Sequence, residues 1–324
     1  MPTTPARRFT PLLVLTLFLL GSTFSFAADK ESAQPEPATE TLVDTTHSSI
    51  SAGLNSASQW FDDFFGDPRI DEEPAGTMLR LRGSTIMTEA EGVSFKGKIK
   101  LNVELPNLKS RYQLILSNED DDLSAEAASG TQSPERPGVQ DKGTSLGLQY
   151  TKRTNQNLIY SNRVSIDYED GLNPQLKTRL RYTLPVSEAS QFNFTQALTW
   201  ENNEGFGQEN RIDFDYTLND QMLLRTTGNG LFSESSNGYE WLALQQLLTS
   251  FSHKKAMTFG SYVRGETRPQ NHVTEYVLFT EYRQSFIKKW LFFELRPEIN
   301  WQREHQFKAA TAFTLTLEVR FGER

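Results

Sequence analysis

The stretch Phe95-Lys96-Gly97-Lys98-Ile99-Lys100-Leu101-Asn102-Val103-Glu104-Leu105 decides the fold expected for this chain. Every second residue, beginning with Phe95, is apolar or glycine, and the residues between them are lysine, asparagine or glutamate. Neighbouring side chains of a β-strand point to opposite faces. The range is therefore predicted to form a long strand with one apolar face and one charged face.

The same alternation continues from residue 77 almost to the end of the chain. It is clear in residues 112–116, 146–150, 158–168, 176–184, 192–200, 212–218, 257–263, 291–301 and 313–321, and weaker in 77–88, 221–233, 239–251 and 273–285. These ranges predict about fourteen strands, with twelve as the alternative count. Residues 241–248 fit either a helical turn or a bulged strand. Pro297 lacks the N–H that a central strand uses, so its strand is expected to end or bulge there.

Two architectures use long alternating strands: a soluble sandwich or barrel with the apolar face inward, and an outer-membrane barrel with that face toward lipid. Segments of about ten residues match the span of a tilted transmembrane strand. Short links alternate with the long link from Asn118 to Gly143, as periplasmic turns and extracellular loops do. Aromatic residues recur near strand ends, where interfacial girdles lie: Tyr150, Tyr168, Tyr182, Trp200, Tyr216 and Trp301. We predict an all-β fold, an antiparallel transmembrane β-barrel over residues 77–324.

The composition excludes several other classes of protein. The chain has 324 residues, no cysteine and a mean hydropathy of -0.54, with one long apolar run near the N-terminus. A polytopic helical membrane protein, a disulfide framework and a cysteine nucleophile are therefore excluded. The formal net charge of -8 argues against nucleic-acid binding.

The N-terminal part of the chain has the features of an exported protein. Arg7 and Arg8 precede an apolar stretch from Leu12 to Leu20, and small residues end at Ala27. This pattern predicts a cleaved signal peptide over residues 1–27, with an uncleaved membrane anchor as the alternative. Residues 28–48 are rich in Ala, Thr, Ser, Glu and Pro, which predicts a disordered tether.

Residues 49–76 are predicted to contain a short amphipathic helix and a linker. Apolar residues recur at spacings of three and four up to Phe65, and Gly66-Asp67-Pro68 is a stop signal. The helix carries an aromatic cluster of Trp60, Phe61, Phe64 and Phe65. It is expected either to lie at a membrane interface or enter the barrel as a plug, or to pack on its own domain.

The C-terminal strand resembles that of Gram-negative outer-membrane β-barrels, which typically alternates hydrophobic residues and ends in an aromatic one. The matching residues are Phe313, Leu315, Leu317, Val319 and Phe321, followed here by Gly322-Glu323-Arg324, which depart from the class. The resemblance implies an outer-membrane location among lipid and recognition by the assembly machinery through the strand that ends at Phe321. The stretch Trp290 to Pro297 is similar to one in uncharacterised proteobacterial outer-membrane proteins, and it implies no activity.

If the apolar faces meet lipid, the charged faces line the lumen. The predicted pore-lining residues are Arg80, Arg82, Lys96, Lys98, Lys100, Arg163, Asp167, Lys177, Arg179, Arg181, Arg211, Asp213 and Asp215. One interpretation is a monomeric porin-like channel or binding barrel, in which segregated charges bias the passage of small polar or charged solutes. The alternative is a closed structural or interaction barrel, plugged by the N-terminal helix, in which salt bridges neutralise the interior.

An enzymatic barrel is the weakest of the three interpretations. The triplets Phe194-Thr195-Gln196 and Ser236-Asn237-Gly238 partly resemble motifs of outer-membrane phospholipase A, but Glu234 stands where that enzyme has its histidine base. Without the base Ser236 is not activated. The four carboxylates Glu119 to Asp122 lack the interleaved spacing of a Ca²⁺ site. We therefore expect no enzyme activity, no cofactor and no metal.

Overall fold

The computed structural model describes residues 57–65, 77–89, 92–105, 111–118, 143–155, 157–168, 171–235 and 238–322. The predicted signal peptide and tether lie outside these residues. The acidic group Glu119 to Asp122 and Ser236 also lie outside them.

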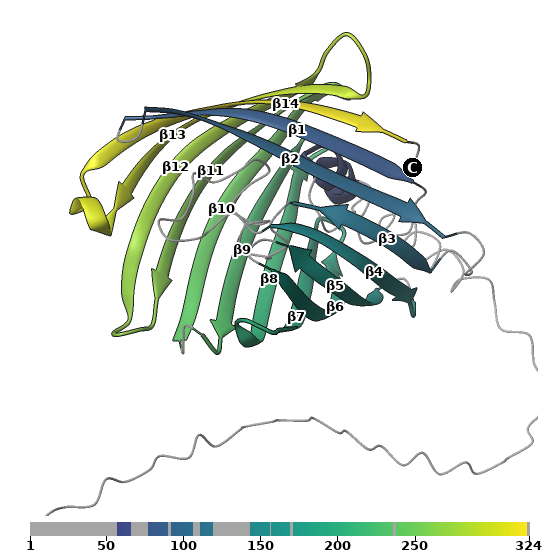
Figure 1. Ribbon diagram of the computed structural model, residues 1–324. Helices are drawn as coiled ribbons and strands as arrows, with labels where there is room; N and C mark the ends of the chain where they lie inside the picture. Colours follow the sequence, from purple (N-terminus) through teal and green to yellow (C-terminus); the bar gives the residue numbers. More distant parts are fainter. Residues whose placement is uncertain are drawn as a thin grey trace, which may run out of the picture. The chain divides into compact units, whose positions relative to one another are not determined.

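Fourteen antiparallel strands close into one barrel, in which neighbours in the chain are neighbours in the wall and β1 pairs with β14 (Figure 1). The prediction of fourteen strands is confirmed. Their bounds are β1 (Met78–Thr88), β2 (Gly92–Glu104), β3 (Tyr112–Ser117), β4 (Thr144–Arg153), β5 (Leu158–Tyr168), β6 (Leu172–Ser187), β7 (Ser190–Glu201), β8 (Gly205–Asn219), β9 (Met222–Ser233), β10 (Gly238–Ser252), β11 (Lys255–Glu266), β12 (His272–Ser285), β13 (Leu291–Gln302) and β14 (Ala309–Phe321), with a 3₁₀ turn, η2 (Arg303–His305), between the last two.

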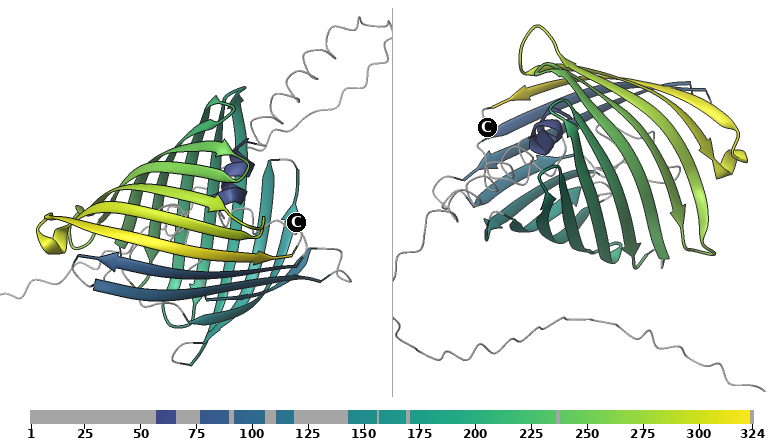
Figure 2. Two further views of the ribbon diagram at one scale, coloured as in Figure 1. Left: turned by 90° about the horizontal axis from the view of Figure 1, so that it is seen from above. Right: turned by 180° about the vertical axis from the view of Figure 1, so that it is seen from behind.

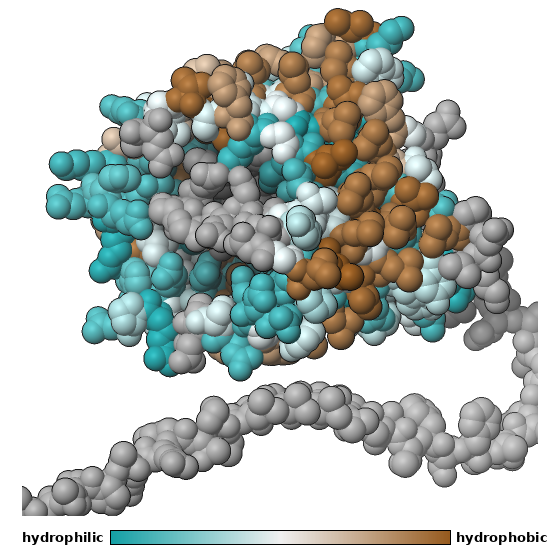
Figure 3. All heavy atoms as spheres, in the orientation of Figure 1, coloured by the Kyte–Doolittle hydropathy of each residue, from teal (hydrophilic) through white to brown (hydrophobic). Residues whose placement is uncertain are grey.

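The outer face of the wall is apolar. Along β7, for example, Phe192, Leu198 and Trp200 are exposed, while Thr195 between them is fully buried. In the described strands, charged side chains at outward positions are confined to strand ends, such as Lys152 and Lys255. Figure 3 shows apolar side chains gathered into a band on the face that it displays. A closed wall that is apolar outside and polar inside is a transmembrane β-barrel, so the soluble alternative is excluded.

The two ends of the barrel differ in the links that they carry. At one end, called the turn end below, β1 begins, β14 ends, and three tight links run from Ser187 to Ser190, Asn219 to Met222 and Ser252 to Lys255. The opposite end, called the loop end, carries the long link between Ser117 and Thr144. The aromatic residues predicted as girdles fall near both ends: Tyr168, Trp200 and Trp301 near the loop end, and Tyr150, Tyr182 and Tyr216 near the turn end.

The two segments that were ambiguous in the sequence, residues 241–248 and the segment around Pro297, are both β-strand. Residues 241–248 pair without interruption with β9 and β11, and the register shifts only between Ser250 and Ser252. The expectation that the strand ends or bulges at Pro297 is wrong, because β13 continues through it and pairs it with Phe313. Pairs with β12 resume on either side in an unchanged register, so the missing N–H affects only local pairing with that strand.

Residues 57–65 form a helix inside the ring of strands, as Figure 2 shows from two directions. Its neighbours are inward side chains of β8 to β11, β13 and β14 close to the turn end. No described helix is long and apolar enough to cross a membrane.

Candidate functional site

Basic side chains gather on two parts of the inner wall, one formed by β1 and β2 and the other by β5 and β6, with β3 and β4 between them. The inward positions of these strands carry Arg80, Arg82, Lys96, Lys98, Lys100, Arg163, Asp167, Lys177, Arg179 and Arg181. The register sets basic residues directly opposite one another, with Lys100 across from Arg80 and Lys177 across from Arg163. Five of the ten are buried: Arg80, Lys100, Lys177, Arg179 and Arg181.

The wall between these two basic parts is uncharged over the described inward positions of β3 and most of β4. Gln113 and Ser117 face inward from β3, and Gln149 and Thr151 face inward from β4. Gln149 accepts hydrogen bonds from Arg163 Nε and Nη2 at 2.9 and 2.7 Å and donates one to Thr151 Oγ1 at 3.2 Å. This part of the wall therefore presents amide and hydroxyl groups to the lumen.

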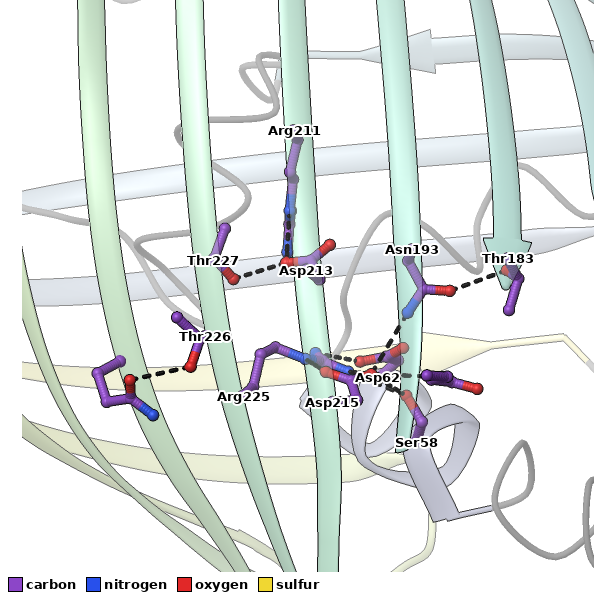
Figure 4. A network of polar contacts seen from close by, with 12 residues as sticks. Ser58, Asp62, Thr183, Asn193, Arg211, Asp213, Asp215, Arg225, Thr226 and Thr227 are labelled. Atoms are coloured by element: carbon purple, nitrogen blue, oxygen red, sulfur yellow. Dashed lines mark hydrogen bonds and ion pairs between the residues drawn. The ribbon is translucent and has the colours of Figure 1, made fainter. Parts of the chain in front are cut away.

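Opposite charges alternate on β8 and β9, in the network of Figure 4. Arg211 Nε donates to Asp213 Oδ1 at 3.0 Å, and Thr227 Oγ1 donates to the same oxygen at 2.6 Å. Asp215 lies two residues further along β8 than Asp213. Arg225 donates hydrogen bonds to both of its carboxylate oxygens, at 2.6 and 2.9 Å. All of these side chains are buried. Because an unpaired buried charge is costly, it matters that each of these ions has an opposite charge beside it.

A second group of paired charges lies on β12, β13 and β14, and its residues are not among the predicted pore-lining residues. Arg283 forms ion pairs with Glu294 and with Glu318, the latter at 2.7 Å. Arg296 Nε donates to Glu298 Oε2 at 3.2 Å. The group consists of Glu281, Arg283, Glu294, Arg296, Glu298, Glu318 and Arg320.

Arg82 links the basic wall to this group. Its guanidinium reaches Glu318 at 3.0 Å and Glu294 at 3.3 Å, so β1 is joined to β13 and β14 by charge as well as by backbone pairing. The missed residues follow the same alternation, at the inward positions of residues 273–285, 291–301 and 313–321. The alternation in 291–301 and 313–321 is a sequence signal that identifies their inward residues, whereas in 273–285 apolar residues on both faces obscure it.

The inner wall also carries two apolar groups. Leu242, Leu244, Tyr262, Val277 and Phe279 form one of them, on β10 to β12. It explains why these ranges show apolar residues on both faces and gave an ambiguous strand signal.

The other apolar group lies at the turn end and forms a seat for the helix. Leu223, Leu248, Ala256 and Phe292 project inward from four strands and form one buried cluster with Phe61, Phe64 and Phe65 of the helix. Trp60 packs against the cluster, and Phe64 meets Phe292 edge to face with ring centroids 5.9 Å apart. The predicted aromatic cluster is thus buried in the lumen, away from the outer surface of the barrel.

Polar contacts join the same helix to the network on β8 and β9. Arg225 Nη1 donates to Asp62 Oδ1 at 2.6 Å, and Arg225 Nη2 donates to Ser58 Oγ at 3.0 Å (Figure 4). Ser58 in turn donates to Asp215 Oδ2 at 2.7 Å. On the opposite side of the helix, Arg320 Nη1 donates to the carbonyl oxygen of Asp63 at 2.9 Å.

The arginines that hold the helix also have carboxylate partners on the wall itself. Arg225 retains Asp215, and Arg320 Nε donates to Glu318 at 2.5 Å. If the helix left the lumen, each arginine would still be paired with a carboxylate of the wall. The apolar seat, by contrast, would be uncovered, so the hydrophobic contacts carry most of the free-energy difference between docked and undocked helix.

Of the residues suggestive of catalysis, Ser236 and Asn237 lie outside the described residues, and Thr195 and Gln196 lie on opposite faces of β7. Thr195 is buried on the inner wall, whereas Gln196 faces outward and donates to Asn210 at 3.3 Å. Glu234 accepts a hydrogen bond from the backbone N–H of Phe206 at 3.0 Å. Among the described residues, no group of three or more His, Asp or Glu side chains could hold a metal ion.

No family model matches the chain, and no curated protein matches it. Similar solved structures include the CymD monoaromatic hydrocarbon channel (7% identity, 78% of this chain and 92% of that one, TM-score 0.47). OccK5 (OpdH) of Pseudomonas aeruginosa is 8% identical over 76% of this chain and 98% of its own, with a TM-score of 0.45. The outer membrane channel DcaP of Acinetobacter baumannii is 7% identical over 76% and 96%, with a TM-score of 0.42. At such identities and TM-scores, neither a solute nor an activity carries over to this chain.

Proposed function

We propose that this protein is a monomeric outer-membrane channel or binding barrel for small polar or charged solutes, exported by a signal peptide over residues 1–27. The observation that carries the proposal is the segregation of charge on the inner wall, with basic side chains on β1, β2, β5 and β6 and paired charges on β8, β9 and β12 to β14. A barrel of this strand number is wider than side chains alone fill. Charged walls around such a lumen bias the passage of ions and charged solutes.

The turn end is proposed to face the periplasm and the loop end the exterior, because β1 begins and β14 ends at the turn end. Outer-membrane lipid would then surround the apolar outer face. The outward side chains of β14 run through Leu317 and Val319 to Phe321, which supports recognition of this strand by the assembly machinery.

A closed barrel plugged by its own helix is the second candidate. It is favoured by the fit between the helix and its seat, in which three phenylalanines of the helix meet four apolar side chains of the wall. Apolar side chains on the inner wall of a water-filled barrel are costly unless something covers them. The two candidates differ in whether the docked helix stops ion flow.

Planar-bilayer recording of the refolded, signal-free chain tests the channel. We expect stable ion conductance whose selectivity shifts when Lys98→Glu and Arg179→Glu are combined, because both side chains lie on the inner wall. The matched control is Lys255→Glu, at the outer edge of the turn end, which should leave selectivity unchanged. Absence of conductance, or selectivity that ignores the lumen variants, would contradict a charge-selective channel.

Deletion of residues 28–70 separates the two candidates. A silent barrel that conducts after the deletion supports the plug, since the helix would have been the obstruction. Equal conductance before and after the deletion removes that role and supports an open channel. The deletion variant must first show the same β-sheet circular dichroism signal as the parent protein.

A further inference from the structure

We infer that a groove on the outer face of the barrel binds lipid A, the phosphorylated and multiply acylated part of lipopolysaccharide. Its acyl chains would lie in the groove, and its phosphates would contact the link between β13 and β14, residues 303–308, called the β13–β14 link below. The inference rests on the proposed function, which places the loop end of the barrel outside the cell.

The groove crosses β12, β13, β14 and β1, which are neighbours in the wall (Figure 1), and it encloses about 650 Å³. One side of it is a row in which Phe313 lies directly opposite both Met87 and Pro297. The other side includes Ile299 and Thr311, which lie directly opposite each other. All five residues are exposed on the outer face. The groove therefore opens toward lipid.

The size of the groove suits an acyl chain. Between the two rows lie Glu298 and Ala312, whose buried side chains point inward, and the small side chains of Thr280 and Thr311 leave space above them. Three strand-to-strand distances of about 4.8 Å give a length of about 14 Å. One leaflet of a bilayer contributes about 15 Å of hydrocarbon. An acyl chain of a single leaflet can therefore lie along the groove.

Two aromatic side chains separate the groove from the β13–β14 link. Tyr276 and Trp301 lie directly opposite each other, and each lies two residues closer to the loop end than a groove residue, Leu278 or Ile299. Aromatic girdles mark the boundary between hydrocarbon and head groups. The groove thus lies on the hydrocarbon side of the girdle and the link on the head-group side, which is how the tails and phosphates of a lipid are arranged.

The β13–β14 link leans over the outer face of the wall. Gln306 and Phe307 have φ values of 56° and 55°, a region that residues other than glycine rarely adopt. The backbone N–H of Phe307 donates to the carbonyl oxygen of Gln302 at 2.8 Å, and the Phe307 ring lies 5.8 Å from the ring of Tyr276 between centroids. Because Tyr276 faces outward, this contact holds the link beside the lipid.

The charges of the β13–β14 link suit a phosphate. Arg303 and Lys308 are both exposed, and within the described part of the chain neither side chain forms an ion pair. Glu304 offsets one of these two positive charges. A guanidinium forms paired hydrogen bonds with phosphate oxygens. Glu89, at the β1 end of the groove, repels a phosphate there, so the head group is expected over β13.

The groove and the link contribute to binding in different ways. Lipid tails are already in hydrocarbon, so the groove offers van der Waals packing and no hydrophobic transfer. Each Arg or Lys near an anionic lipid head group contributes about fivefold in affinity. The link therefore selects the lipid, and the groove sets the position of its acyl chains.

Native mass spectrometry of the refolded, signal-free chain in detergent tests the site, because it counts the lipids that stay bound. Lipid A is titrated, with phosphatidylglycerol and phosphatidylcholine as comparison lipids. We expect one lipid A to bind at least about fivefold more tightly than phosphatidylglycerol, since lipid A has two phosphates and phosphatidylglycerol has one. Equal binding of phosphatidylglycerol would overturn the assignment to lipid A.

Removal of the two basic side chains tests the head-group contact. Arg303→Gln combined with Lys308→Gln should weaken lipid A binding about tenfold or more, because two attractive charges are lost. The matched control is Lys254→Gln combined with Lys255→Gln, which removes the same charge from exposed positions at the turn end. The control should bind lipid A as the parent protein does.

A larger side chain in the groove tests the acyl-chain contact. Thr311→Trp should weaken lipid A binding about threefold or more, because the indole occupies the space of the chain and its packing is lost. Ala243→Trp is the control, since Ala243 is an exposed outward residue of β10 away from the groove. Unchanged β-sheet circular dichroism shows that each variant is folded.

Unchanged lipid A binding in either the link variant or the Thr311→Trp variant would overturn the inference. The comparison of lipids on the parent protein tests it without any variant. Binding is measured independently of conductance. A barrel that conducts but does not prefer lipid A keeps the channel function and loses the lipid site, whereas one that binds lipid A without conducting keeps the site and loses the channel.

Discussion

Arg225 is the residue at which the wall and the N-terminal helix meet. It donates to Asp215 of the wall through two nitrogens and to Asp62 of the helix through a third. The two carboxylates are not equivalent, because the wall partner remains when the helix moves. Removing the helix partner should therefore affect docking, and removing the wall partner should affect the barrel itself.

Asp62→Asn is expected to loosen the helix without weakening the barrel. A hydrogen bond to a charged group contributes about 1.5–3 kcal/mol, so the undocked fraction should rise roughly tenfold to a hundredfold. The natural chain has no cysteine, so a single Ala256→Cys in the helix seat can report undocking. The rate of labelling by a soluble thiol reagent is the measurement, because the Ala256 side chain is fully buried under the docked helix.

Asp63→Asn in the same Ala256→Cys background is the matched control. The Asp63 carboxylate is half exposed and 3.9 Å from Arg320, so its loss is worth at most about 1 kcal/mol. Labelling should then rise by less than about fivefold. Equal labelling rates for the two variants would show that Arg225 does not hold the helix through Asp62.

At the scale of the element, each strand presents two environments that tolerate different residues. Along β14, Phe313, Leu315 and Leu317 face outward, while Thr314, Thr316 and Glu318, which alternate with them, are buried on the inner wall. The same side chain should therefore have opposite effects at neighbouring positions of one strand.

Leu317→Arg is expected to destabilise the folded barrel in lipid vesicles by about 2–4 kcal/mol, because it moves a charge into hydrocarbon. Urea unfolding monitored by tryptophan fluorescence gives the free energy. Lys100→Arg, on the inner wall of β2, is the control and should change the free energy by much less, since the charge stays in the lumen. If Leu317→Arg left the free energy of unfolding unchanged, the outer face of the barrel would not be in contact with lipid.

The N-terminal helix is an element whose stability depends on its surroundings. The nine described residues of the helix are too few to persist as an isolated helix in water. Its aromatic side chains are buried against Leu223, Leu248, Ala256 and Phe292, and packing of this kind supplies what the helix cannot supply itself. The helix therefore depends on its seat for stability, and the two form one feature of the lumen.

At the scale of the whole molecule, closure is the dominant property. Because β1 pairs with β14 over ten residues, the wall has no free edge and every strand has two neighbours. Closed barrels in which all strands are paired resist unfolding until the entire ring opens. This predicts a behaviour that separates a membrane barrel from an ordinary periplasmic protein.

In outer-membrane fractions, the protein should migrate at two positions on a detergent gel, one for samples kept cool and one for boiled samples. The folded ring binds less detergent and stays compact until heat opens it. Tryptic digestion of the cool sample should leave the barrel intact. A single mobility at all temperatures, together with recovery in the soluble periplasmic fraction, would contradict the membrane location.

Most of the fold followed from local pattern. Residues 95–105 and their counterparts alternate with period two, and that period identifies the strands and the side chains that share a face. The predicted bounds of the weak ranges lie within one residue of those of β1, β9, β10 and β12. Two ambiguities arose where the local pattern is degenerate: at 241–248, because apolar residues occupy both faces, and at Pro297, because one missing N–H does not end a strand that is paired on its other side.

The sequence by itself determined that this chain forms a barrel of about fourteen strands with lipid outside and charge inside, because side-chain alternation is a property of neighbouring residues. Only the tertiary structure decided which charges meet. Arg82 reaches Glu294 and Glu318 across the closing seam, and Asp62 reaches Arg225 from a helix far away in the chain. Those contacts depend on closure of the ring and on the shape of the seat, and neither is encoded in the spacing of residues along one strand.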